Sequence, residues 1–155
     1  MPARNTVERR VRQRFADKVD ARVARRAARS MGVLSLAELR ECGLSRDGVH
    51  KRCRAGHLHA IHRGVFAVGH PGLTPEARIL AAVKACGATA VASHRAAAYL
   101  YGLIDEVPRP EVTVIGQGTR RHRGVRVHRT RALDDLDRRR WKGIPVTSPA
   151  RTMLD

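Results

Sequence analysis

The segment from Ser35 to Gly56 constrains the fold most, because it has the pattern of two short capped helices joined by a tight turn. Ser35 and Glu38 have the spacing of a capping box, in which each side chain accepts a hydrogen bond from the other residue's backbone N–H. Gly43 ends this first helix, since glycine tolerates the left-handed conformation of a helix terminus. Ser45 then caps a second helix, which ends at Gly56. This order predicts a helix-turn-helix.

The second helix is expected to have an apolar face and a basic face. Val49 and Cys53 lie four residues apart and are predicted to point inward. The basic side chains follow the same step on another face, with one beside them: Arg46, His50 and Arg54, then Lys51. If this helix entered a major groove, that face would meet phosphates or base edges.

A β-hairpin is predicted directly after the second helix. Residues 57–62 and 65–68 are rich in β-forming residues and are separated by Arg63 and Gly64, which suit a tight turn. Helix-turn-helix and hairpin together predict a winged helix-turn-helix that binds DNA. The hairpin adds these candidate DNA-binding residues to those of the helix: His57, His59, His62 and Arg63. A solvated basic face that binds nothing is the alternative.

The charge balance agrees with a polyanionic partner but does not locate its site. The chain has 31 Lys and Arg residues against 14 Asp and Glu, which gives a net charge of +17. With one Trp, two Tyr and two Phe, it offers few platforms for stacking single-stranded bases. Its 155 residues suit one domain or two small ones.

The pattern along the chain predicts an α+β fold with three parts. Apolar residues recur every four positions from Val7 to Ala27 and indicate one long helix or two in succession. We therefore expect a basic N-terminal arm or helix over residues 1–17, and the winged helix-turn-helix over residues 18–70. A small mixed α/β region is expected over residues 74–155.

The third part has recognisable helix starts and β-rich runs. Thr74, Ser93 and Ser148 are expected to cap helices, two of them with proline at the next position. Strands are expected in these ranges: 88–92, 111–115, 125–128 and 144–146.

Several classes of protein are disfavoured by the sequence. No apolar run approaches the roughly 20 residues of a transmembrane helix, and the charged N-terminus does not resemble a secretory signal. Three widely spaced cysteines indicate a reducing compartment, so we expect a cytoplasmic protein without a membrane partner. A zinc site from Cys42, Cys53, His57 and His59 lacks the usual ligand spacing, so neither a metal nor a cofactor is expected.

The candidate catalytic residues favour a protein that is not an enzyme. Glu111 lacks the nearby lysine of a Glu-x-Lys nuclease motif. The acidic residues between Asp134 and Asp137 are followed by arginines and suit a solvated charged turn or helix start. His94 is interpreted as a hydrogen-bonded residue near a helix start, because no partner at suggestive spacing supports a catalytic role.

Three runs of residues resemble one known family: GHLHAIHRGVFAVGH at 56–70, ASHRAAA at 92–98 and IPVTSPART at 144–152. They are similar to the AbiEi family of antitoxins, from type IV toxin–antitoxin systems. The resemblance implies an N-terminal winged-helix domain that represses the operon, and a second domain that counteracts a nucleotidyltransferase-like toxin.

We therefore expect a sequence-specific transcriptional repressor that binds double-stranded operator DNA, and an antitoxin whose partner is a nucleotidyltransferase-like toxin. Two alternatives stay open. Many family members continue into an endonuclease-like domain, so the chain could be the N-terminal part of a DNA-processing protein. A winged helix can also bind proteins, in which case an apolar patch is expected near Val65 and Phe66.

Overall fold

The structure is a computed structural model that describes residues 3–118 and 120–155. Its helices are α1 (Ala3–Ala28), α2 (Leu36–Glu41), α3 (Arg46–Arg54), α4 (Pro75–Cys86), α5 (His94–Leu100), the 3₁₀ helix η1 (Asp135–Asp137) and α6 (Pro149–Leu154). Its strands are β1 (Val33–Ser35), β2 (Leu58–His62), β3 (Val65–Val68), β4 (Val91–Ala92), β5 (Glu111–Ile115), β6 (Arg126–Thr130), β7 (Arg138–Trp141) and β8 (Ile144–Thr147). The mixture of helices and strands confirms the α+β class.

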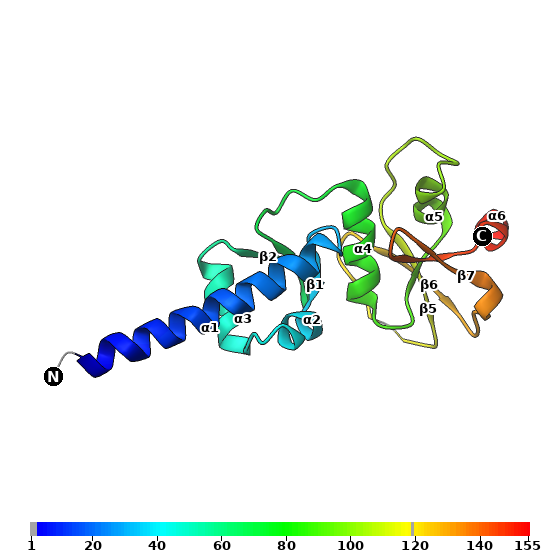
Figure 1. Ribbon diagram of the computed structural model, residues 1–155. Helices are drawn as coiled ribbons and strands as arrows, with labels where there is room; N and C mark the ends of the chain where they lie inside the picture. The colour runs from blue at the N-terminus through cyan, green and yellow to red at the C-terminus, as the bar shows by residue number, and fades with distance from the viewer. Residues whose placement is uncertain (1–2, 119) are drawn as a thin grey trace.

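The apolar pattern before the helix-turn-helix forms one continuous helix, α1. Its C-terminal half packs on the helix-turn-helix, where Val19 and Val23 are buried with Leu39. Its N-terminal half projects from the molecule (Figure 1), and there Val11 and Phe15 are 62% and 63% exposed. The N-terminal segment is therefore a helix from Ala3 onward rather than a loose arm, while residues 1 and 2 lie outside the described part.

Both predicted helix caps of the helix-turn-helix are confirmed. The Glu38 N–H donates to Ser35 Oγ at 3.2 Å, and the Ser35 N–H donates to Glu38 Oε2 at 2.7 Å, which completes the capping box. The Gly48 N–H donates to Ser45 Oγ at 3.1 Å at the start of α3. Gly43, in the turn between the helices, has φ of +100°, a conformation that favours glycine.

The predicted hairpin is also confirmed, and it belongs to a small sheet. β3 lies between β1 and β2 and pairs with both in antiparallel fashion. The β2–β3 register shifts between Ala60 and His62, which indicates a bulge next to the turn at Arg63 and Gly64. Because β1 leads directly into α2, this sheet fixes where the helix-turn-helix begins.

The second sheet has five strands in the order β6-β5-β4-β8-β7. The strands expected over 111–115 and 125–128 are present as β5 and β6, and they pair with each other in parallel. The region after Asp134 differs from the expectation. Residues 135–137 form the short 3₁₀ helix η1. The following arginines, Arg138 to Arg140, belong to β7, an edge strand that pairs with β8. Backbone pairing with β8 therefore outweighs the low strand preference of this charged run.

The expected cap at Ser93 is wrong, whereas those at Thr74 and Ser148 are confirmed. Ser93 makes no capping hydrogen bond to α5. Instead it is fully buried, and its Oγ accepts a hydrogen bond from Thr113 Oγ1 at 2.7 Å. The Ser93 hydroxyl therefore links the start of α5 to β5 through this hydrogen bond.

Helix α4 lies between the two sheets (Figure 1) and packs against both. Ala77 and Ala81 form a buried cluster with Val33 and Val65 of the small sheet. Other α4 side chains belong to the core of the five-stranded sheet: Ile79, Leu80, Ala82 and Val83. The helix-turn-helix and the second sheet are thus joined through one shared helix.

Glu38 links α2 to α4 as well as capping α2, because Lys84 Nζ lies 2.6 Å from its Oε2. Burial alone raises the pKa of the Glu38 carboxyl, but the hydrogen bond and charge of Lys84 and the Ser35 N–H outweigh burial, so the pKa lies below its ordinary value of 4.5. A carboxyl whose pKa falls on folding stabilises the fold above its unfolded pKa, and this contribution is lost as pH falls through the folded pKa.

We therefore expect Glu38→Gln to lower the free energy of unfolding at neutral pH and to flatten its decline at pH below 4.5. Urea unfolding across a pH series measures both effects. Glu106→Gln is the matched control, since the Glu106 carboxylate pairs with Arg95 at 2.8 Å but is 80% exposed. Equal changes in the two variants would contradict a special role for Glu38.

Candidate nucleic-acid interface

The predicted basic face of α3 is exposed and has no competing internal contacts. All four of its basic residues are exposed: Arg46, His50, Lys51 and Arg54. Across residues 3–118 and 120–155, their side chains make no hydrogen bond or ion pair with another side chain. On the opposite side of α3, Val49 is 5% exposed and packs in the core with Leu44. The sequence pattern thus separated the two faces of this helix correctly.

Carboxylates near the helix-turn-helix are held in ion pairs elsewhere. Glu41 lies 2.8 Å from Arg26 of α1, and Asp20 lies 2.7 Å from Arg52. Arg52 also donates to the Gly48 carbonyl at 3.2 Å, so this basic residue of α3 serves packing and is not on the exposed basic face. Asp47, the acidic residue of α3, is exposed in the first turn of the helix. The basic face therefore keeps most of its positive field.

The hairpin residues lie in different environments. His57 and Arg63 are exposed at the two ends of β2, and the His59 ring lies 3.4 Å from the Gly69 carbonyl oxygen. His62 is half-buried. Burial, and then the charge of His122, lower its pKa, so the ring is uncharged at neutral pH and attracts phosphate weakly. Among the predicted hairpin residues, Arg63 is the one that carries a permanent charge into solvent.

The hairpin does not present the apolar patch expected of a protein-binding wing. Val65 is 1% exposed and contacts α4, while Phe66 is half-buried against the core of the helix-turn-helix. The apolar side chains of β3 are thus used within the molecule.

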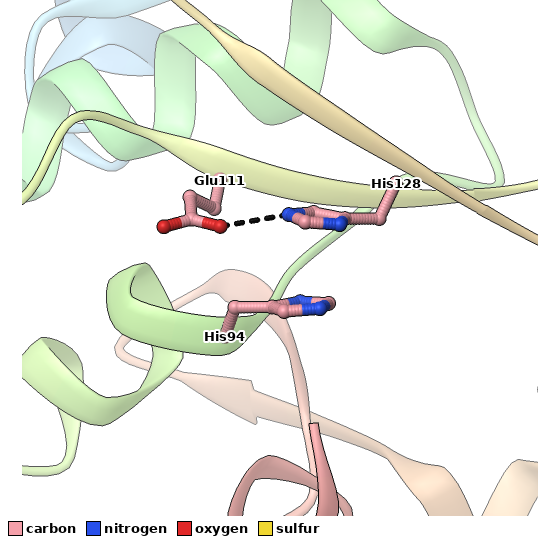
Figure 2. Close-up of side chains that lie close together, drawn as sticks. All are labelled: His94, Glu111 and His128. Carbon is pink, nitrogen blue, oxygen red and sulfur yellow. Dashed lines mark hydrogen bonds and ion pairs between the residues drawn. The ribbon is translucent and has the colours of Figure 1, made fainter.

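A second cluster of polar side chains, drawn in Figure 2, was not predicted from the sequence. His94 at the start of α5, Glu111 of β5 and His128 of β6 lie together. His128 Nε2 lies 2.7 Å from Glu111 Oε2, and the two imidazole rings stack with centroids 3.5 Å apart. These three residues lie far apart in the sequence, and the parallel register of β5 and β6 that brings two of them together could not be predicted. The structure does not bring Cys42, Cys53, His57 and His59 together into such a group within its described residues.

In the described part of the chain, no helix is both long enough and apolar enough to cross a membrane.

Comparison with known proteins identifies the region that carries the basic face. No curated protein matches the chain. The family model for "Transcriptional regulator, AbiEi antitoxin" matches residues 21–69. That range includes the C-terminal part of α1, the helix-turn-helix and the hairpin, whereas the similar runs at 92–98 and 144–152 lie outside it. Residues 21–69 are therefore similar to the AbiEi antitoxin family of transcriptional regulators, in agreement with the resemblance carried by the run at 56–70.

Proposed function

We propose that the chain is a sequence-specific transcriptional repressor that places α3 in the major groove of double-stranded DNA. The exposed and unpaired basic face of α3, within the region that matches a family of regulators, is the observation that carries this proposal. A helix of this kind contacts bases mainly through its N-terminal residues, so Arg46 and His50 are the first candidates for base contacts. Lys51 and Arg54 contribute phosphate or further base contacts.

We assign the β2–β3 hairpin the role of a wing. Arg63 lies at its turn and contacts a phosphate or the minor groove, with His57 and His59 near the same backbone. The burial of Val65 supports DNA over a protein as the partner of this surface, since no large apolar patch surrounds the turn.

The Arg63 assignment predicts a loss of affinity that does not depend on DNA sequence. Arg63→Ala should weaken binding to a selected duplex and to a scrambled duplex alike, and should flatten the salt dependence by roughly one unit if one phosphate contact is lost. Fluorescence anisotropy over a salt series, with the duplex selected from a random library, measures this. Arg126→Ala removes another exposed arginine, in β6, and serves as the control. An unchanged slope in Arg63→Ala would remove the hairpin from the interface.

The type IV toxin–antitoxin role is proposed on the family match alone. In this proposal residues 18–70 bind the operator, and residues 74–155 contact a nucleotidyltransferase-like toxin. Because α4 fills part of the core beneath the small sheet, the roles are better separated by point variants of the full chain than by truncation. Co-expression with such a toxin encoded beside the gene tests the assignment, and failure of the full chain to restore growth would contradict it.

A further inference from the structure

A group of metal-ligating side chains that the proposed repressor function does not use lies where α5 begins beside the second sheet. One ligand atom from each of His94, Glu111 and His128 lies within 4.8 Å of the others. We propose that these three residues bind a divalent transition-metal ion of the Zn²⁺ type. Two imidazoles and one carboxylate are a donor set that suits Zn²⁺ and leaves a coordination position open.

Glu111 contributes a carboxylate that is almost fully buried. Its side chain is 6% exposed, and His128 Nε2, 2.7 Å away, is its hydrogen-bond partner (Figure 2). A buried carboxylate is costly without a compensating charge or hydrogen bonds. A bound cation between Glu111 and His128 would replace this single hydrogen bond and neutralise the carboxylate directly.

The two histidine rings lie face to face. They stack with centroids 3.5 Å apart and an interplanar angle of 10°. Both rings are therefore close enough to Glu111 to contribute a nitrogen to one shared ion.

Neighbouring residues orient His94 toward the other two. Ser93 Oγ lies 3.0 Å from His94 Nδ1 and itself accepts a hydrogen bond from Thr113 Oγ1, while Asp155 Oδ2 lies 3.8 Å from the same Nδ1. When the Nδ1–H donates to Ser93 Oγ, Nε2 is the nitrogen with a free lone pair for a metal ion. His94 also has φ of +52°, which is uncommon for a residue with a side chain. Backbone strain of this kind persists where the surroundings over-determine it, and here it directs the ring toward Glu111 and His128.

Metal titration of the full chain, without a histidine tag and after chelator treatment, tests the site. Co²⁺ is the spectroscopic probe and Zn²⁺ the competitor, and we expect one ion per chain with visible Co²⁺ absorption that Zn²⁺ abolishes. Glu111→Gln and His128→Ala should each lower the affinity at least about tenfold. His70→Ala, which removes an exposed histidine that follows β3, is the matched control and should bind metal as the parent chain does.

Thermal unfolding separates a metal site from a purely structural cluster. Loss of the Glu111–His128 hydrogen bond lowers the melting temperature of either variant without metal, so the decisive quantity is the rise that Zn²⁺ adds. That rise should vanish in both variants and persist in His70→Ala. His94→Gln leaves the Glu111–His128 hydrogen bond in place and keeps the test valid if the other variants do not fold. Undiminished Co²⁺ binding in His94→Gln, or no saturable binding by the parent chain, would overturn the proposal.

Discussion

Replacing Arg46 or Arg54 by alanine is expected to weaken binding to the operator by about 1–3 kcal/mol, if the arginine makes a bidentate contact to guanine. This corresponds to roughly 5-fold to 150-fold in the dissociation constant. Both side chains are exposed on α3 and lack internal partners among the described residues, so their removal should leave the fold intact. On scrambled DNA the loss should be much smaller, because only charge is removed there.

Three measurements make this result decisive. Anisotropy titrations on selected and scrambled duplexes give the specific and non-specific affinities, and circular dichroism checks the fold. Arg126→Ala is the control for the loss of one positive charge away from α3. If Arg46→Ala, Arg54→Ala and Arg63→Ala all remain folded and bind both duplexes as the parent chain does, the helix-turn-helix is not the DNA-binding surface. The protein-interaction alternative would then be the better account.

Leu39→Ala is expected to lower the free energy of unfolding by about 2–5 kcal/mol. Leu39 is fully buried on α2, in the cluster that contains Val19 and Val23 of α1 and Val49 of α3. Shortening its side chain removes packing against α1 and α3 and leaves a cavity in this cluster. Chemical denaturation monitored by circular dichroism measures the change.

Leu136→Ala provides the same chemical change at an exposed site. Leu136 lies in η1 and is 79% exposed, so a change within about 0.5 kcal/mol is expected. Similar losses in the two variants would show that the cluster around Leu39 does not hold α1 against the helix-turn-helix. The packing described for α1 would then be wrong.

The helix boundaries of residues 35–56 were predictable because their determinants are local. Ser35 and Glu38 cap the first helix through contacts three residues apart, and Ser45 caps the second over the same distance. The inward position of Val49 follows from helical periodicity and was predicted for the same reason. The basic face of α3 could therefore be identified from the sequence.

Local patterns failed where a residue's partner lies far along the chain. Ser93 has the sequence context of a helix cap, but the approach of β5 gives its hydroxyl a different partner in Thr113. Arg138 to Arg140 form an edge strand because β8 offers backbone hydrogen bonds that a run of charges does not reveal. The packing of α4 against both sheets could likewise not be predicted, because its side chains pack with residues that lie far away in the sequence.

The sequence alone determined the capped helices, the hairpin and the excess of positive charge, since each depends on neighbouring residues or on composition. Only the tertiary structure decided that His94, Glu111 and His128 meet, because β5 and β6 pair in parallel and α5 begins beside them. Side chains far apart in the sequence are brought within bonding distance by strand register, and a strand's own sequence does not encode the register of its partner.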